Sequence, residues 1–307
     1  MNELKIAAIG GGTGLSTMLK GLKLHTRKIT AIVSVADDGG SSGVLRTDMG
    51  MLPPGDVRNC IAALSDVEEE YSTLLNYRFK DGVFAGHTVG NMLLAAINET
   101  TDNFDEAVTK LSRLVGISGT VIPVSNESIV LGAVLDNGET ILGESNIGHH
   151  DGTKARIDHV FTKPSSPAPV ESALKAISNA DIIVLGPGSL YTSVIPNLLV
   201  DGITEAILKS KAKKIYVCNI MTQPGETDAM TASEHLDALE RHSVPGIVDY
   251  IVVNDAPLPQ SVKAVYAEEG SVPVTADIDA LAKRVNVLHG HMYLVRDGQV
   301  RHNFIRL

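Results

Sequence analysis

The sequence has few aromatic residues and few cysteines, and both shortages narrow the classes of protein to which it can belong. Tryptophan is absent and aromatic residues make up 4% of the 307 residues, so the core must consist mainly of Val, Ile, Leu and Ala. The two cysteines, Cys60 and Cys218, lie far apart and form no CxxC pair, which favours buried, reduced thiols over a disulfide or a zinc site. The composition, 44% hydrophobic and 20% charged, excludes a disordered chain, a collagen-like repeat and a disulfide scaffold.

Long apolar runs and an excess of positive charge are also lacking. No stretch approaches the roughly 20 apolar residues of a membrane helix, and the N-terminal apolar run stops at glycines, unlike that of a secretory signal. We therefore expect a cytoplasmic protein without a membrane span. The formal net charge of -10 argues against binding of nucleic acid, which needs a basic surface. It leaves room for a local anion site, because backbone N–H groups bind phosphate without a charged side chain.

Short apolar runs alternate with helical segments, which predicts an α/β fold with a doubly wound, mostly parallel, Rossmann-like sheet. Leu4–Ile9 and Ile29–Val35 show no polar alternation, as is typical of strands buried on both faces. Thr13–Leu24 between them has helical spacing, so the three segments begin a βαβ unit. The length fits one large unit or two domains, and we expect a single large α/β unit over residues 1–307.

The remaining elements follow from the same patterns. Helices are predicted in the first half at Val57–Leu64, Ser72–Phe79, Val89–Asn98 and Asp105–Val115. Residues 37–56, rich in Gly, Ser, Asp and Pro, are predicted to form a long functional loop. Strand signals at Thr120–Val124, Ile129–Leu135 and Thr140–Leu142 predict a smaller subregion, at about 116–165, inserted between two βα halves.

The second half repeats the alternation and ends in a hairpin. Strands are predicted at Asp181–Leu185, Lys214–Cys218 and Tyr250–Val253. Helices are predicted at Leu198–Ser210, Ala229–His242 and Ser261–Glu269. The segments Met292–Val295 and Val300–Ile305 are predicted to pair as the closing hairpin.

The glycine cluster Gly10–Gly14 stands between the first strand and the first helix, where ligands bind in open α/β sheets. Glycine lets the backbone approach a phosphate, and the helix N-terminus supplies free N–H groups. The cluster fits neither G-x-G-x-x-G, because position 15 is Leu15, nor the P-loop, which needs a Lys followed by Ser or Thr. A tight turn without a ligand is the alternative. The predicted phosphate contacts are Gly11, Gly12, Thr13 and Gly14.

Two adjacent carboxylates follow the second strand. Asp37 and Asp38, in a Gly/Ser loop with Ser41 and Ser42, would accept hydrogen bonds from a ribose, as an acid does at this place in dinucleotide folds. They would otherwise hold Mg²⁺ with phosphates completing its shell, and Asp38 is the predicted metal contact. A solvated turn is the remaining alternative. No prosthetic group is expected.

Two later helix starts carry polar residues. Asp56 is placed as an N-cap, and Arg58 lies in a first turn, where a cation opposes the helix dipole. We therefore expect Arg58, with Asn59 beside it, to meet a phosphate or a carboxylate, with a structural salt bridge as the alternative. At the second start, Asn91 is the better ligand contact, and His87 is a ligand contact, as a general base or a donor to phosphate, or only a hydrogen-bonding loop residue.

A second Gly/Ser loop, Gly186–Ser193, again follows a buried strand and precedes a helix, so a diphosphate could be held between two such loops. The predicted contacts are Gly186, Gly188, Ser189, Leu190, Tyr191 and Thr192. The residues His149, His150, Asp151, Asp158 and His159 have metal-ligand types, but their surroundings indicate an exposed polar loop rather than a zinc site. No G-x-S-x-G motif is present, so covalent catalysis is not expected.

Six motifs in this order resemble those of the gluconeogenesis factors, the YvcK-like branch of the 2-phospho-L-lactate transferase superfamily. The motifs are Ile9–Gly14, Ala36–Gly43, Pro54–Asn59, Gly86–Asn91, Gly186–Ser193 and Met221–Thr227. The resemblance implies a nucleotide at the strand ends, binding of UDP-sugars such as UDP-N-acetylglucosamine, and a link with cell shape and growth on gluconeogenic carbon. It also implies that Tyr266 and Arg301 contact the sugar nucleotide.

We therefore expect a nucleotide-sugar-binding regulatory protein that links central carbon metabolism to cell-wall precursor synthesis. Its expected partners are cell-wall synthesis regulators or enzymes, and its expected state is a homo-oligomer. The first alternative is an enzyme like the transferase relatives, which join a phospholactyl group from a guanosine diphosphate donor to a deazaflavin alcohol with Mg²⁺; Asp38 or Asp56 would then take the acceptor proton. The Gly-Gly-Ser-Ser-Gly segment after the aspartates departs from the transferase pattern. The second alternative, NAD(P) binding, is weakened by Leu15.

Overall fold

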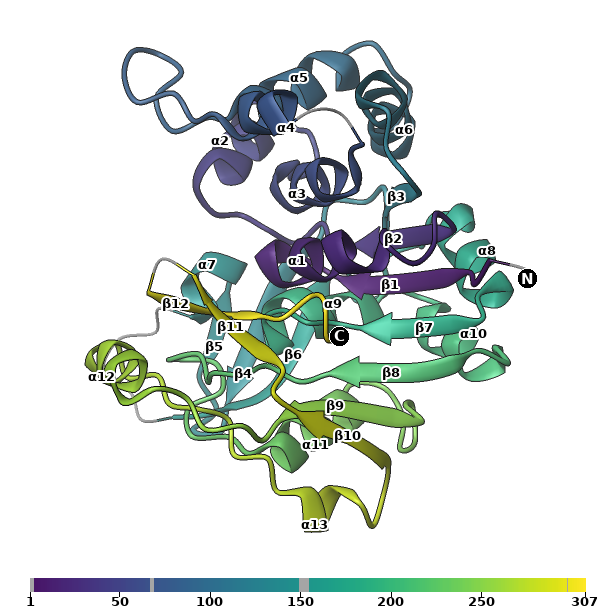
Figure 1. Ribbon diagram of the computed structural model, residues 1–307. Helices are drawn as coiled ribbons and strands as arrows, with labels where there is room; N and C mark the ends of the chain where they lie inside the picture. The colour runs from purple at the N-terminus through teal and green to yellow at the C-terminus, as the bar shows by residue number, and fades with distance from the viewer. Residues whose placement is uncertain (1–2, 67–68, 149–154, 297) are drawn as a thin grey trace.

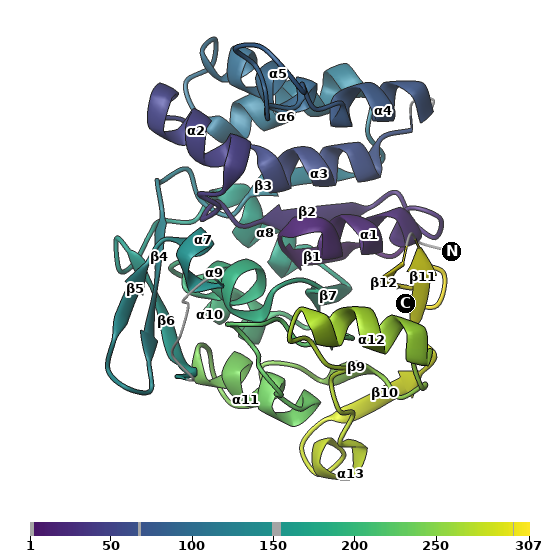
Figure 2. The same cartoon turned by 90° about the vertical axis from the view of Figure 1, so that its left-hand side faces the viewer.

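A seven-stranded parallel sheet forms the centre of the computed structural model, which describes residues 3–66, 69–148, 155–296 and 298–307. The strands are, in the order in which they lie in the sheet, β10 (Asn286–Gly290), β9 (Tyr250–Asn254), β8 (Lys213–Val217), β7 (Ile182–Leu185), β1 (Ile6–Gly10), β2 (Ile29–Val33) and β3 (Thr120–Pro123). Helix α1 (Gly12–Leu22) covers one face, and α8 (Glu171–Asn179), α9 (Ile195–Leu198) and α10 (Ile203–Lys209) cover the other (Figures 1 and 2). The predicted doubly wound α/β fold is confirmed.

The strand order reverses between β1 and β7, and this determines where a ligand can bind. The chain runs from β1 through β2 to β3 on one side, and from β7 through β8 and β9 to β10 on the other. All five residues of β1 are buried, as expected of a strand with neighbours on both sides and helices on both faces. The loops that follow β1 and β7 leave the same edge of the sheet in neighbouring positions, which is the usual binding crevice of such folds.

Five helices between β2 and β3 form a lobe above one end of the sheet (Figures 1 and 2). They are α2 (Gly40–Met49), α3 (Gly55–Leu64), α4 (Glu69–Asn76), α5 (Val89–Asn98) and α6 (Phe104–Val115). The prediction of a long loop over residues 37–56 is wrong, because α2 occupies half of it. This helix buries Ser41, Ser42 and Leu45 on one face and ends at Gly50, whose φ of 64° stops it. The helix predicted at 72–79 starts earlier and ends at Asn76.

A separate antiparallel sheet follows β3. It contains β4 (Val130–Leu135), β5 (Thr140–Leu142) and β6 (Ile157–Lys163) in the order β5-β4-β6, and the short helix α7 (Glu144–Ile147) follows β5. The predicted strands and turn of the β4–β5 hairpin are confirmed. The prediction of an exposed loop around Asp158 and His159 is wrong, because both lie on β6, which pairs with β4.

The second half adds helices around the lower strands and ends in a small hairpin. Its further elements are the π-helix η1 (Leu190–Val194), α11 (Ala232–Arg241), α12 (Gln260–Glu268), α13 (Ile278–Leu281), β11 (Tyr293–Arg296) and β12 (Gln299–His302). The prediction of one continuous helix over residues 198–210 is wrong. Gly202, with φ of 72°, separates the end of α9 from the start of α10. The hairpin β11–β12 is confirmed, whereas β10 and α13 were not predicted.

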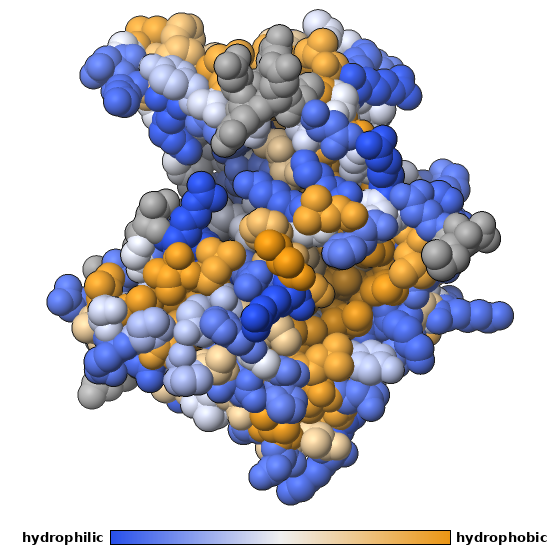
Figure 3. Space-filling view, viewed as in Figure 1, coloured by the Kyte–Doolittle hydropathy of each residue, from blue (hydrophilic) through white to orange (hydrophobic). Residues whose placement is uncertain are grey.

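The C-terminal hairpin lies over α1 on the face shown in Figure 1, and hydrophobic residues gather in the centre of that face (Figure 3). Both cysteine thiols are buried and free, as predicted. Within the described residues, every helix is too short or too polar to cross a lipid bilayer.

Candidate functional site

The two glycine loops predicted to hold phosphate lie against each other. A Cβ atom on Gly14 would be 2.7 Å from the carbonyl oxygen of Pro187, and one on Gly188 would be 3.1 Å from that of Gly11. Glycine is therefore needed on both sides for the loops to approach so closely. Gly12 and Gly186, with φ of 67° and 76°, also adopt the left-handed conformation. The loops after β1 and β7 thus form one continuous surface.

A cavity of about 430 Å³ opens over this surface. The carboxyl ends of the strands, from which the two loops leave, face the viewer in Figure 2. Its volume is within the range of small-ligand sites. Its lining consists of Gly11, Gly12, Thr13, Gly14, Thr17, Asp37, Asp56, Glu144, Gly188, Ser189, Ser193, Asn219, Ile220, Met221, Thr222, Gln223, Tyr266, Val300, Arg301 and His302. The residues among these that the sequence singled out are Gly11, Gly12, Thr13, Gly14, Asp37, Asp56, Gly188, Ser189, Tyr266 and Arg301.

One end of the cavity is acidic, with Asp37, Asp56 and Glu144 in its wall. Burial, followed by the charge of Asp37, raises the pKa of Asp56 to about 6, although its carboxyl accepts a hydrogen bond from the Gly12 N–H. Burial and the charges of Asp37 and Asp56 raise the pKa of Glu144 well above its usual value. Asp56 and Glu144 therefore retain their protons more readily than free acids do. The prediction of Asp56 as a helix N-cap is wrong, since Pro54 caps α3 and Asp56 lies in the first turn.

Asp38 connects the small sheet to the acidic end. Its Oδ1 accepts a hydrogen bond of 2.8 Å from the backbone N–H of Ser145, in the first turn of α7. Gly143 leaves space for this carboxyl, because a Cβ atom there would be 2.7 Å from Asp38 Oδ2. Asp38 itself borders a neighbouring groove rather than the cavity. Through this contact the end of β2 positions the adjacent Glu144, which no sequence motif indicated.

The opposite end of the cavity is aromatic and carries a cationic side chain, that of Arg301. The Tyr266 hydroxyl accepts a hydrogen bond of 2.9 Å from the Val300 N–H and packs beside a small apolar cluster that includes Ile220. Burial lowers the pKa of His302 to about 4, so its ring is neutral, and its Nδ1 has no partner among the described residues. Arg301 supplies a cation at this end. Figure 2 shows the two ends separated, with α7 on one side of α1 and the β11–β12 hairpin on the other.

A row of amide and hydroxyl groups runs from the second glycine loop toward the aromatic end of the cavity. Gln223 Nε2 donates to Ser189 Oγ at 2.6 Å, and Asn219 Nδ2 donates to Gln223 Oε1 at 3.3 Å. The loop after β8 that carries these amides is closed by the hydrogen bond of 2.9 Å from the Gln223 N–H to Thr227 Oγ1. This row offers neutral donors and acceptors to a ligand.

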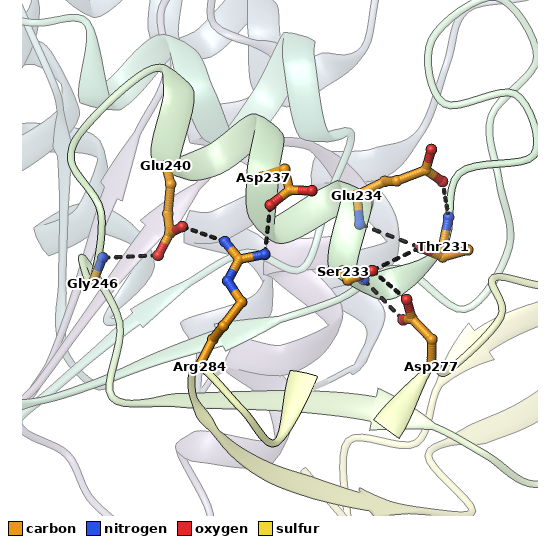
Figure 4. A network of polar contacts seen from close by, with 8 residues as sticks. All are labelled: Thr231, Ser233, Glu234, Asp237, Glu240, Gly246, Asp277 and Arg284. Atoms are coloured by element: carbon orange, nitrogen blue, oxygen red, sulfur yellow. Dashed lines mark hydrogen bonds and ion pairs between the residues drawn. The ribbon is translucent and has the colours of Figure 1, made fainter. Parts of the chain in front are cut away.

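The far end of the same loop is anchored by the start of α11, shown in Figure 4. Thr231 and Glu234 form a capping box with hydrogen bonds of 3.3 Å and 2.7 Å. Ser233 binds the Asp277 carboxylate through both its N–H and its hydroxyl, and Arg284 pairs with two carboxylates of α11. The polar loop therefore runs between two fixed points, the end of β8 and the start of α11.

Several residues predicted as ligand contacts form a network behind the acidic end. Arg58 donates from Nε to Asn91 Oδ1 at 3.3 Å and from Nη1 to Asn76 Oδ1. Asn91 Nδ2 donates to Ser41 Oγ at 3.0 Å, and this hydroxyl lies 2.9 Å from His87 Nδ1. Burial and the charge of a neighbouring arginine lower the pKa of Arg58. Ser42 accepts from the Gly55 N–H, and Asn59 lies on α3. None of these side chains is in the described lining of the cavity, so their ligand contacts stay predictions.

The remaining predicted residues lie along the second loop. Gly186, Leu190, Tyr191 and Thr192 are buried beneath the cavity, the last three in the π-helix. Tyr191 borders a second cavity of about 310 Å³ beside β6 and α11. Thr192 lies 3.4 Å from a carboxylate oxygen of Glu226, whose pKa burial raises to about 7.

The acidic groups do not form a metal cage by themselves. In the described part of the chain, no three His, Cys, Asp or Glu side chains are grouped as a metal site. Asp38, the predicted Mg²⁺ contact, uses one oxygen for the Ser145 N–H. His149, His150 and Asp151 lie outside the described residues, and Asp158 pairs with His159 and Arg241.

Comparison with known proteins agrees with the motifs. The family model of 2-phospho-L-lactate transferase CofD matches residues 6–293. The chain is 47% identical to the gluconeogenesis factor of Halalkalibacterium halodurans, over 99% of this chain and 94% of that one. It is 45% identical to that of Bacillus subtilis (strain 168), over 97% and 94% of the two chains. The crystal structure of a UPF0052 family member from Bacillus halodurans, 46% identical, superimposes with a TM-score of 0.95 over 100% of this chain and 97% of that one. The chain therefore belongs to the 2-phospho-L-lactate transferase CofD family, in the branch of the gluconeogenesis factors.

Proposed function

We propose that the cavity binds a nucleotide sugar of the UDP-N-acetylglucosamine type, and that the protein is a regulator linking central carbon metabolism to cell-wall precursor synthesis and cell shape. The observation that carries this proposal is the division of the cavity into three parts. Two glycine loops lie in the middle, an aromatic and amide wall lies at one end, and carboxyl groups lie at the other. A nucleotide sugar has the same order of parts: a base, a diphosphate and a polyhydroxyl group.

The diphosphate would lie over the glycine loops. The first N–H groups of a helix have no partner within it, and Asp56 uses that of Gly12. The N–H groups of Thr13 and Gly14 are left at the start of α1, beside Gly188 and Ser189 of the other loop. Backbone donors of this kind suit phosphate and explain how an acidic protein could bind an anion.

The base would lie at the hairpin end. The ring of Tyr266 offers a flat apolar surface, and Asn219 and Gln223 offer amide donors and acceptors in the same wall. Arg301 is the cation placed to meet a phosphate or the polar edge of the base. A pyrimidine such as uracil is recognised by this combination of stacking and amide hydrogen bonds.

Calorimetry tests the proposal directly. We expect the wild-type protein to bind UDP-N-acetylglucosamine and UDP more tightly than GDP and NADP⁺. Base stacking contributes about 1–3 kcal/mol, so Tyr266→Ala should weaken UDP binding by about tenfold or more. Tyr77→Ala is a matched control, because Tyr77 is half exposed in the helical lobe, away from the cavity. Equal binding of NADP⁺, or no binding of uridine nucleotides, would overturn the proposal.

A transferase is the second candidate, and the family model and Asp56 favour it. A carboxyl group with a pKa of about 6 inside the cavity is poised to take the proton of an acceptor hydroxyl. Because no ready metal cage is present among the residues that the structure describes, any Mg²⁺ would take most of its ligands from phosphates and water. Incubation with a labelled phospholactyl–guanosine diphosphate donor and a deazaflavin alcohol decides between the two. Formation of the product would show that the protein is a transferase and would overturn the proposal that it acts only as a regulator.

A further inference from the structure

Glu144 comes from a different part of the fold than the other residues that line the cavity. It is the one residue of the small sheet region, among those described, that lines the cavity. It lies in the first turn of α7, next to the Ser145 N–H that Asp38 holds at 2.8 Å. Its carboxyl group has no hydrogen-bond partner among the described residues, so it is available to a ligand.

The surroundings of Glu144 determine what kind of group it can meet. The negative charges of Asp37, in the loop after β2, and of Asp56, in the first turn of α3, act on it most strongly, and Glu226 and Asp38 add smaller contributions. Together with burial, these charges keep Glu144 protonated well above the usual pKa of a glutamic acid. A second anion is disfavoured here, whereas a neutral group with hydroxyl or amide functions can exchange hydrogen bonds with a protonated carboxyl.

The position along the cavity identifies which part of the ligand this is. The glycine loops lie between Glu144 and the β11–β12 hairpin, and Figure 2 shows α7 and that hairpin on opposite sides of α1. If the base lies against Tyr266 and the diphosphate over the loops, the group that reaches Glu144 is the glycosyl residue.

We propose, on the basis of the proposed function, that Glu144 is the specificity-determining contact for the glycosyl group and distinguishes a nucleotide sugar from the free nucleoside diphosphate. In this role its carboxyl group exchanges hydrogen bonds with the hydroxyl groups or the N-acetyl group of the sugar. The free nucleotide does not reach it.

The test compares two ligands on four proteins by calorimetry near neutral pH. The ligands are UDP and UDP-N-acetylglucosamine, and the proteins are the wild type, Glu144→Ala, Glu144→Gln and Glu139→Gln. Glu139 is an exposed residue of the β4–β5 turn and serves as the matched control. Thermal melts of all four establish that they are folded.

The wild type should bind the sugar nucleotide about tenfold more tightly than UDP, as one buried hydrogen bond allows. Glu144→Ala should reduce the affinity for the sugar nucleotide to that for UDP and leave UDP binding unchanged. Glu144→Gln should keep most of the preference for the sugar nucleotide over UDP, because the side-chain amide also forms hydrogen bonds with the sugar. Glu139→Gln should match the wild type.

Three results would overturn the inference. The first is an equal loss for both ligands in Glu144→Ala, the second is no loss for either, and the third is a loss in Glu144→Gln as large as in Glu144→Ala. In each of these cases UDP binding by the wild type still supports the proposed function. A wild type that binds neither ligand overturns the function itself, and the inference with it.

Discussion

The carboxyl group of Asp56 lies directly against the backbone of Gly11, where a Cβ atom would be 2.5 Å from Asp56 Oδ2. The same carboxyl accepts a hydrogen bond from the N–H of Gly12. The carboxyl group of Asp56 therefore occupies part of the N-terminus of α1, and an anionic ligand can use only the remaining N–H groups there. Gly11 has an extended backbone, with φ of -167°, so glycine is needed here for space and not for conformation.

We expect Gly11→Ala to displace the Asp56 carboxyl and to lower the free energy of unfolding by about 1–3 kcal/mol, as overpacking does. Gly10→Ala is the matched control, because a Cβ atom on Gly10 would meet its nearest neighbours at ordinary distances of 3.7 and 3.8 Å. Urea unfolding measures both. Adding Asp56→Ala to Gly11→Ala should recover part of the loss. Equal losses at the two glycines would show that the contact with Asp56 is not the cause.

The buried carboxyl of Asp56 also predicts a pH-dependent stability. Burial raises its pKa from 3.8 to about 6, so the folded protein holds a proton there more tightly than the unfolded chain. This favours the folded state below about pH 4, and the advantage, equivalent to about 3 kcal/mol, is lost as the pH rises through 6. Asp56→Asn keeps an acceptor for the Gly12 N–H and carries no charge.

Asp56→Asn should therefore be more stable than the wild type near pH 8 and gain much less near pH 5. Urea unfolding at the two pH values measures the difference. Glu139→Gln, which neutralises an exposed acid, should change the stability by less than about 0.5 kcal/mol at either pH. A gain for Asp56→Asn that is the same at both pH values would contradict the assignment of the raised pKa.

Local patterns predicted the parts of this structure that depend on neighbours in sequence. The strands β1 and β2 and the loops Gly10–Gly14 and Gly186–Ser193 follow from apolar runs that end in glycine. That the two loops hold one diphosphate was a hypothesis, and their contact depends on β7 lying beside β1, which no local pattern predicted. Helix α2 was missed, since two glycines and three hydroxyl residues in ten positions resemble a loop. Its burial against the lobe overrides that low propensity.

The features of the site that the sequence did not predict depend on contacts between residues that are distant in sequence. Glu144 follows a glycine beside the small sheet, and its neighbour Ser145 is bonded to Asp38, more than a hundred residues earlier in the sequence. Arg58 was expected to meet an anion, but its charged group lies against the amide oxygens of Asn76 and Asn91. Sequence reasoning identified the unfavourable position of the arginine on its helix and could not identify its neutral partners.

The bond between Asp38 and Ser145 gives a further prediction. Asp38→Ala removes the acceptor of the Ser145 N–H, so that amide should exchange hydrogen faster, and the preference for UDP-N-acetylglucosamine over UDP should fall as Glu144 loses its fixed position. UDP binding alone should stay within about twofold of the wild type. Asp48→Ala is the control, because Asp48 is an exposed acid on α2, the helix that follows Asp38. If Asp38 were instead a metal ligand, its removal would abolish any Mg²⁺ dependence of UDP binding as well.

His242 joins the small sheet to the main body through both ring nitrogens. Its Nδ1 lies 2.7 Å from the carbonyl oxygen of Ala238, and its Nε2 accepts a hydrogen bond of 2.8 Å from the Val160 N–H of β6. The two bonds require a neutral ring with the proton on Nδ1. Burial lowers the pKa of His242, the charges of His159 and Arg241 lower it further, and Asp158 opposes them. The stabilisation is thus present above the ordinary value of 6.5 and is lost as the pH falls through the lower folded value.

His242→Ala should lower the free energy of unfolding by about 1–3 kcal/mol near pH 8, because it leaves the buried Val160 N–H without an acceptor. The loss should shrink at acidic pH, where a protonated ring can no longer accept that bond. His159→Ala is the control on the same strand, since that side chain is 45% exposed and its ion pair with Asp158 contributes little. Hydrogen exchange at the Val160 amide should rise in His242→Ala and stay unchanged in His159→Ala. An unchanged rate in both variants would mean that the small sheet is held by its apolar contacts alone.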